Sequence, residues 1–172
     1  MQRNKGFSLI ELLIVVAIIL VIAAIAIPNL LASRKSANEA SAVGSLQAIK
    51  TGEYAYLNAY PTVGYAAQIS NLGGIGNPCV ATSSSACLLD SSVVNAIPGG
   101  PAKSGFMFLA TGIPIGALNG AFVAGASPVI VQQTGNRDFC STDDGVLRSQ
   151  MGSVGDIPVN TQAACVAFAV AQ

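Results

Sequence analysis

Residues 5–27 read KGFSLIELLIVVAIILVIAAIAI, and this stretch decides how the N-terminal part of the chain folds. No residue from Leu12 to Ile27 is polar. A helix that begins at Phe7 and ends at Ile27 would be roughly 31 Å long, which is enough to cross a hydrocarbon core of about 30 Å. The stretch therefore predicts a membrane-spanning helix.

A secretory signal peptide is the first alternative for this stretch. Arg3 and Lys5 would form its charged region, and residues 24–26 (AIA) resemble a cleavage site. However, the acidic Glu11 interrupts the apolar run, and an ordinary signal peptide gains nothing from it. A carboxylate inside a membrane helix costs on the order of 2.5–3.5 kcal/mol, so it needs a partner or a purpose.

Cleavage between Gly6 and Phe7 would provide that partner. Phe7 would then carry a free α-amine, and Glu11 lies four residues along, on the same helical face and one turn away. An amine and a carboxylate in this relation can neutralise each other, either within one chain or between neighbouring chains. The alternative is a carboxylate that is tolerated near the membrane interface.

Residues 5–12 (KGFSLIEL) resemble the cleavage and methylation signal of type IV prepilins and of the pseudopilins of type II secretion. The resemblance implies that a prepilin peptidase cuts after Gly6 and N-methylates Phe7. It also implies that Glu11 pairs with the Phe7 amine of an adjacent, identical subunit during assembly. The precursor would be a single-pass protein of a bacterial inner membrane, and its exported head would later belong to a surface pilus or a periplasmic pseudopilus.

Pro28 follows the apolar run, and a proline inside a helix kinks or breaks it. It either ends the membrane helix or marks the bend that the resembled family has at this place. Residues 29–60 continue as an amphipathic helix, which Pro61 stops. Lys50 and Glu53 interrupt its apolar stripe as an i,i+3 pair, and we expect both to be solvated at its rim. The stripe consists of Val43, Leu46, Ile49, Tyr54, Leu57 and Tyr60.

The remainder of the chain is rich in turns and short strands. Strands are predicted at residues 106–111, 121–124, 129–132, 137–141 and 146–149. Asp143-Asp144-Gly145 separates the last two and predicts a hairpin, because glycine accepts a positive φ. The pattern indicates a small antiparallel sheet of about four strands packed on the second half of the helix. Together with the resemblance, it predicts the α+β pilin fold.

Four cysteines, Cys79, Cys87, Cys140 and Cys165, allow three disulfide pairings. We favour Cys79–Cys87 and Cys140–Cys165 because short local closure is geometrically easiest, and the second loop resembles the C-terminal disulfide loop of type IV pilins. The chain has no C-x-x-C spacing and no histidine, so we expect no zinc site. Asp143, Asp144 and Asp156 could mimic the calcium-binding loop of type II major pseudopilins, but we expect turn and solvent roles for them.

The amino-acid composition of the chain limits the classes of function that we expect for it. Eight basic and eight acidic residues leave no basic excess, so no nucleic-acid site is evident. Without histidine there is no imidazole base, and no serine or cysteine stands in a recognisable nucleophile setting. We therefore expect neither an enzyme nor a cofactor. A total of 9% charged residues suits a subunit that buries much of its surface against copies of itself.

The predicted organisation is a leader at residues 1–6, a transmembrane and filament-core helix at 7–28, its amphipathic continuation at 29–60, and an exported head at 61–172. The predicted function is that of a structural subunit of a type IV pilus-like filament, which the pilus assembly machinery polymerises. A major pseudopilin of a type II secretion system is the first alternative. A low-copy tip pilin that acts as a binding module is the second. Adhesion, motility, DNA uptake and secretion all remain open as roles of the fibre.

Overall fold

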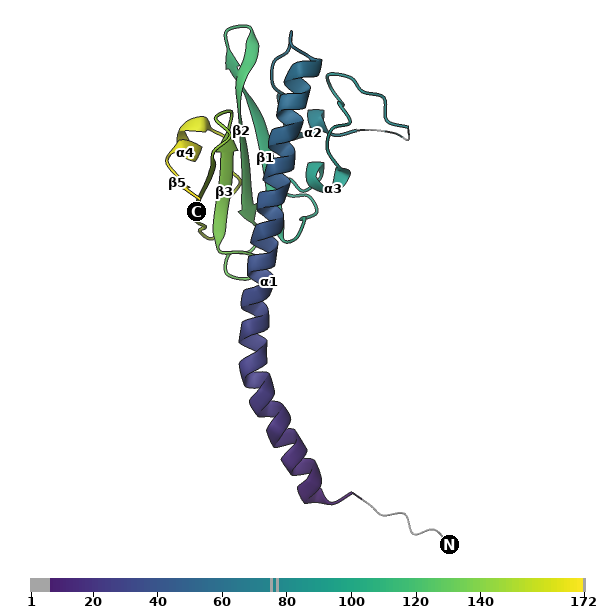
Figure 1. Cartoon of the computed structure of the whole chain (residues 1–172), viewed down its shortest axis with the longest axis vertical. Coiled ribbons are helices and arrows are strands. Elements are labelled where there is room, and N and C mark those ends of the chain that lie inside the picture. Colours follow the sequence, from purple (N-terminus) through teal and green to yellow (C-terminus); the bar gives the residue numbers. More distant parts are fainter. Residues whose placement is uncertain (1–6, 75, 77, 172) are drawn as a thin grey trace. The chain divides into compact units, whose positions relative to one another are not determined.

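The computed structural model describes residues 7–74, 76 and 78–171. The predicted leader, residues 1–6, lies outside the described residues. The chain divides into two compact units, one that ends at Arg34 and one that begins at Lys35. Helix α1, Leu9–Ala59, contributes to both units (Figure 1).

Helix α1 contains Pro28 in its interior. Of the two alternatives for Pro28, the structure contradicts the one in which it ends the helix. The loss of one backbone hydrogen bond does not outweigh a long flanking run of leucine, isoleucine and alanine. A bend at Pro28 stays a prediction. The helix ends at Ala59, two residues before Pro61, because a proline disfavours helical geometry in the residue that precedes it.

The second unit carries an antiparallel sheet of five strands in the order β1-β2-β3-β4-β5 (Figure 1). The strands are β1 Phe106–Ile115, β2 Leu118–Pro128, β3 Arg137–Thr142, β4 Leu147–Met151 and β5 Ala169–Val170. The short helices are α2 Ile69–Leu72, α3 Ser91–Val94 and α4 Gln162–Val166. Each strand pairs with the next one along the chain, so the sheet is a simple meander.

Strands β1 and β2 form a hairpin that extends several residues beyond the two predicted strands at 106–111 and 121–124. Strands β3 and β4 flank Asp143-Asp144-Gly145, and Gly145 has φ +72°, as the predicted hairpin requires. The predicted strand at residues 129–132 is wrong. This segment folds into a local turn, in which Gln132 has φ +68° and its N–H donates to the carbonyl of Gly135.

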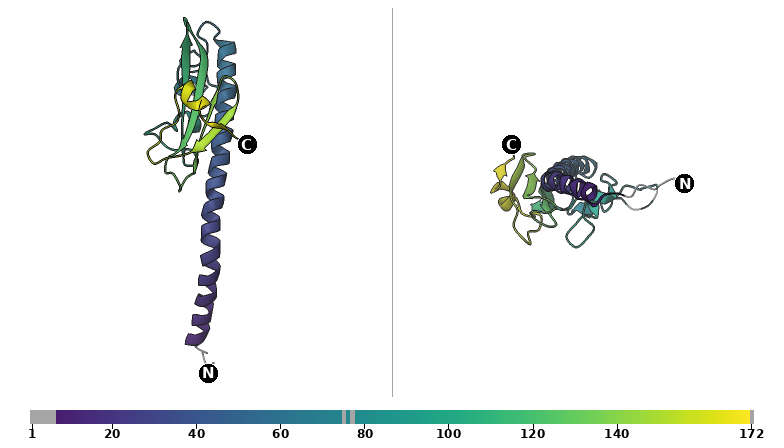
Figure 2. Two further views of the ribbon diagram at one scale, coloured as in Figure 1. Left: turned by 90° about the vertical axis from the view of Figure 1, so that its left-hand side faces the viewer. Right: turned by 90° about the horizontal axis from the view of Figure 1, so that it is seen from below.

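The core lies between the sheet and the second half of α1 (Figure 2). Its largest fully buried side chains come from α1 and from three strands: Leu46, Ile49, Tyr56, Phe106, Phe108, Phe122 and Phe139. A smaller buried cluster consists of Val123, Cys140, Cys165 and Phe168. Its members from β2 and β3 lie on the face of the sheet opposite the main core, because successive side chains of a strand point to opposite faces. The sheet is therefore packed on both faces, with this cluster in the second layer. Gly125 allows the second layer to approach, because a Cβ there would meet the backbone of Val159.

Candidate functional site

The first unit is a helix with an apolar surface. Between Leu12 and Ile27, the large apolar side chains are between 47% (Val16) and 65% (Ile25) exposed. The most apolar 18-residue window of α1 has a mean hydropathy of 3.3, and its length and composition are enough to cross a membrane. Apolar surface on this scale is unfavourable in water and requires lipid or other apolar helices around it.

Glu11 lies in the first turn of this helix, and its side chain turns back toward the N-terminus. Its Oε2 accepts a hydrogen bond from the backbone N–H of Ser8 at 2.9 Å. Ser8 is the residue before the first helical residue, so Glu11 occupies the third helical position, where glutamate caps a helix. The capping role of Glu11 was not predicted, although the spacing Ser8-x-x-Glu11 before an apolar run is the sequence signal of such a capping box.

This geometry gives Glu11 a structural role beside the predicted assembly role. Phe7 precedes Ser8 and has an 85% exposed side chain. The carboxylate therefore already reaches the backbone nitrogen one residue from Phe7. Gly6, the other half of the predicted cleavage site, lies outside the described residues.

Two further carboxylates hold α1 to the rest of the second unit. Glu39 is 7% exposed and accepts hydrogen bonds from the Asn136 N–H at 2.8 Å and from Arg137 Nε at 3.0 Å. Glu53 is fully buried, and its Oε2 accepts from the Ala66 N–H at 2.8 Å. The two side chains fix the loop before β3 and the loop after the helix.

The expectation that Lys50 and Glu53 are both solvated at the rim of the helix is therefore wrong. Lys50 is only partly buried and donates to the carbonyl of Gly145 at 3.3 Å. Burial raises the pKa of Glu53 to about 7, although the hydrogen bond from Ala66 lowers it. Helical spacing alone could not reveal this, because the residues after Pro61 fold back over Glu53 and exclude water from it.

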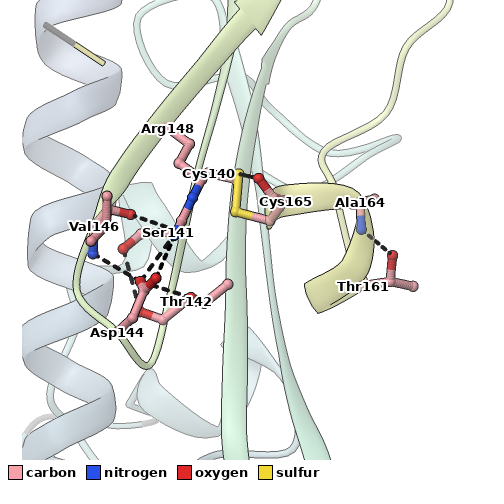
Figure 3. The surroundings of a disulfide bond; sticks show 9 residues. All are labelled: Cys140, Ser141, Thr142, Asp144, Val146, Arg148, Thr161, Ala164 and Cys165. Carbon is pink, nitrogen blue, oxygen red and sulfur yellow. Dashed lines mark hydrogen bonds and ion pairs between the residues drawn. A yellow bond between two sulfur atoms is a disulfide. The ribbon is translucent and has the colours of Figure 1, made fainter. Parts of the chain in front are cut away.

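The structure pairs Cys79 with Cys87 and Cys140 with Cys165, with Cα atoms 6.2 and 5.8 Å apart. Cys140 and Cys165 are fully buried and join β3 to α4 (Figure 3). Thr161 caps α4 by accepting from the Ala164 N–H. This disulfide therefore holds the C-terminal segment against the second layer of the sheet.

Protein donors bind both carboxylates of the β3–β4 turn, and Figure 3 shows the contacts of Asp144. Asp144 accepts from Thr142, from the Val146 N–H and from Arg148, and the Arg148 guanidinium holds its pKa well below the usual range. Asp143 accepts from Gln162 at 3.0 Å. Asp144 therefore stabilises the turn, and Asp143 links the turn to α4.

One family and three relatives match the chain. The family matches the N-terminal motif, and each relative matches over a short segment. The family described as the prokaryotic N-terminal methylation motif matches residues 1–27. A type IV wide pilus major component, PilA4 of Thermus thermophilus, is 67% identical over 39 residues, which are 23% of this chain and 30% of the relative. No solved structure matches the chain significantly.

The other two relatives extend the comparison to a second kind of system. The type IV major pilin protein PilA of Myxococcus xanthus is 45% identical over 56 residues, which are 33% of this chain and 26% of the relative. The type II secretion system core protein G of Klebsiella pneumoniae is 36% identical over 50 residues, 29% of this chain and 36% of the relative. The chain thus spans 26–36% of the length of these relatives. The chain carries the prokaryotic N-terminal methylation motif and is similar, over short segments, to two type IV pilins and one type II secretion core protein. Its apolar N-terminal helix, antiparallel sheet and two disulfides are consistent with the pilin fold.

Proposed function

We propose that the protein is a structural subunit of a type IV pilus-like filament. The observation that carries the proposal is the exposed apolar helix with Glu11 in its first turn. A prepilin peptidase would cut after Gly6 and methylate the new Phe7 amine. The precursor would be anchored in the inner membrane by this helix, and the head would be exported.

Filament assembly would move the N-terminal helix from one apolar environment, the membrane, into another, the filament core. In the membrane, lipid covers the side chains of Leu12 to Ile27; in the filament, the helices of neighbouring subunits would cover them. Because this exchange offers little net hydrophobic gain, packing and polar contacts must set the register. Glu11 is the one charged side chain between Phe7 and Ile27, and it would pair with the Phe7 amine of a neighbour.

The free-energy cost of inserting a subunit in the wrong register would make filament assembly specific for one register. An unpaired charge buried among apolar helices costs several kcal/mol, whereas a charge paired with an opposite one is largely compensated. A subunit that enters out of register would leave both its carboxylate and a neighbouring amine unpaired. Assembly partners would therefore be identical subunits, brought together by a pilus assembly machinery.

A pseudopilin of a type II secretion system is the second candidate, and the similarity to core protein G favours it. The Cys140–Cys165 loop favours the pilus, because it resembles the C-terminal disulfide loop of type IV pilins. Surface filaments sheared from the producing cells separate the two candidates. We expect this chain to be the main subunit of such filaments by mass. If the chain is absent from them and its deletion stops protein secretion, the secretion candidate replaces the pilus.

A further inference from the structure

Arg34 and Lys35 are two neighbouring basic residues of α1 that have no acidic partner among the described residues. The ion pairs of the described chain use other bases, Arg137 and Arg148. On an isolated helix, Lys35 would pair with the carboxylate four residues later, which is Glu39. Glu39 is instead buried in the head and bound by Arg137. The two positive charges are therefore free to bind a partner outside the chain.

The position of this basic pair along α1 suits the surface of a lipid bilayer. Lys35 follows Ile27, the last residue of the apolar run, by about 12 Å along one continuous helix. The headgroup region extends roughly 5–8 Å beyond the hydrocarbon core. Side chains of a helix lean toward its N-terminus, and long basic side chains reach several ångströms along its surface. Both charges therefore come within reach of lipid phosphates when the apolar run spans the membrane.

The end of the head that carries Lys35 also exposes apolar side chains. Asn38, one turn after Lys35, donates through Nδ2 to the carbonyl of Thr134 at 2.9 Å. This contact holds the turn between β2 and β3 against α1. Val129 and Ile130 begin this turn, and both are half-exposed. No residue from position 129 to position 136 carries a charge.

The loop after β4 adds further apolar surface at the same end of the head. Met151 pairs with Arg137, so this loop begins where β3 begins. Met151 is 71% exposed, and Val154, at 95%, is the most exposed large apolar side chain of the described residues. Asp156 closes the loop by accepting from the Ser153 N–H at 2.6 Å. Four large apolar side chains are thus exposed at the end of the head that carries Lys35.

We propose that this end of the head binds the phospholipid surface of the membrane while the subunit is not yet assembled. Lipid phosphates would bind the basic pair, and the apolar side chains would enter the boundary between headgroups and acyl chains. Basic and apolar side chains together are typical of protein segments that lie in a membrane interface, and the positive charges favour anionic lipids. The membrane-facing surface consists of Lys35, with Arg34 before it on α1, and of Val129, Ile130, Met151 and Val154.

A second copy of the chain fits this surface less well than lipid does. The described carboxylates are buried or already bound by donors of their own chain: Glu11, Glu39, Glu53, Asp90, Asp138, Asp143, Asp144 and Asp156. A neighbouring subunit therefore offers the basic pair fewer acidic partners than a layer of lipid phosphates does. Lipid is also the partner that the chain meets first, because the same helix enters the membrane. The inference rests on the proposed membrane anchoring and not on filament assembly.

Tryptophan fluorescence tests the proposal, because the chain itself has no tryptophan. Full-length chains with the single substitution Val154→Trp are reconstituted, at low density, in vesicles of equal parts phosphatidylethanolamine and phosphatidylglycerol. A nitroxide on a fraction of the lipid headgroups quenches any tryptophan near it. We expect about a twofold loss of Val154→Trp fluorescence. The control Ile115→Trp lies in the exposed β1–β2 connection, beside the C-terminal end of α1, and should keep its fluorescence (Figure 1).

The charge dependence of the quenching tests the role of the basic pair. Added to Val154→Trp, Arg34→Gln and Lys35→Gln should each lower the equilibrium for lipid contact about fivefold. High NaCl should act in the same direction, because it screens exposed charges. The matched control Lys50→Gln removes a base that is bound to Gly145, and it should leave the quenching unchanged.

A third reporter, Val21→Trp, lies in the apolar run and shows whether the helix is inserted. If an acyl-chain nitroxide quenches Val21→Trp while a headgroup nitroxide leaves Val154→Trp unquenched, this inference is overturned and the anchoring stands. An unquenched Val21→Trp contradicts the anchoring and, with it, this inference. Equal quenching of Val154→Trp and Ile115→Trp also overturns the proposal, as does quenching that persists unchanged in both glutamine variants. A Val154→Trp that becomes shielded from water only in sheared fibres would assign the surface to contacts between copies instead.

Discussion

Glu53 accepts a hydrogen bond from the backbone N–H of Ala66, 2.8 Å from Oε2, while its Oε1 is buried and has no partner among the described residues. One buried carboxyl group thus holds the loop after α1. Burying its charged form away from water costs free energy. The cost depends on pH, because burial raises the pKa of Glu53 from 4.5 to about 7.

The first prediction is that Glu53 makes the head less stable as the pH rises from 4.5 to 7. In this window the folded head keeps the proton and the unfolded chain does not, so the free energy of unfolding falls with rising pH. The contribution is complete below pH 4.5 and lost above pH 7, and it amounts to at most about 3 kcal/mol.

Glu53→Gln isolates this effect, because the amide oxygen can still accept from Ala66 but does not titrate. Thermal unfolding of wild type and variant should give similar stability at pH 5 and a more stable variant at pH 8. A difference between the two proteins that does not change with pH would show that Glu53 does not titrate in this range. Asp144 acts in the opposite direction, since its lowered pKa makes the head lose stability only at lower pH.

The second prediction concerns the contact of Glu39 with the start of β3. Glu39→Ala should lower the free energy of unfolding by about 2–3 kcal/mol, because it leaves the part-buried N–H of Asn136 and the guanidinium of Arg137 without their acceptor. Glu39→Gln keeps an acceptor and should cost about 1 kcal/mol or less, since the Arg137 side chain is 45% exposed. Denaturant unfolding measures both. Equal losses in the two variants would contradict this ranking.

The third prediction ranks the disulfides. The Cys140–Cys165 bridge spans 25 residues and the Cys79–Cys87 bridge spans 8, so the chain-entropy model gives about 3.5 and about 2.5 kcal/mol. Cys140→Ser should therefore lower head stability and subunit accumulation more than Cys87→Ser. Non-reducing digestion must first return both linked peptides. A crossed pairing or free thiols would overturn the account of the head.

The sequence predicted the elements whose signals are local. The apolar helix, the hairpin at Asp143-Asp144-Gly145 and the approximate sheet all follow from periodicity and turn residues. The strand predicted at 129–132 is wrong because the preference of β-branched residues for strands is weak without a packed face. Val129 and Ile130 are about half exposed, and hydrogen bonds within the turn hold the segment instead. The two-residue strand β5 has no local signal at all, since it exists only where the chain returns to β4.

The burial of Glu53 and Asp138 could not be predicted from helical or strand periodicity alone. The burial of Glu53 depends on a loop that begins after the helix has ended. Asp138 was within reach of a simple argument, because it alternates with Phe139 along β3 and therefore shares a face with the disulfide-bonded Cys140. A charged residue beside a buried disulfide is itself expected to be buried.

The fourth prediction concerns processing. The mature chain should begin at N-methylated Phe7, so intact mass should match residues 7–172 with one added methyl group and two disulfides. A side chain at position 6 would obstruct the approach of the peptidase to the backbone, so Gly6→Val should accumulate as uncut precursor in the membrane. A chain that starts at Ile27 would instead identify an ordinary signal peptide, and an uncut wild-type chain would exclude processing.

The fifth prediction concerns the charge of Glu11. Glutamine also caps helices, so Glu11→Gln should preserve the hydrogen bond with Ser8 and the start of α1. The amide cannot neutralise a buried amine, however, so each Phe7 amine in the fibre would remain unpaired at a cost of several kcal/mol. Insertion should improve slightly, because an amide costs less in lipid than a carboxylate.

The most direct measurement compares membrane-fraction protein with sheared surface fibres, in cells whose only copy of the subunit is either wild type or Glu11→Gln. We expect equal cleavage after Gly6, equal or greater membrane content in the variant, and a greatly reduced yield of variant fibres. Fibres of Glu11→Gln at the wild-type yield would show that the carboxylate is not an assembly contact, and would contradict the proposed function at its centre.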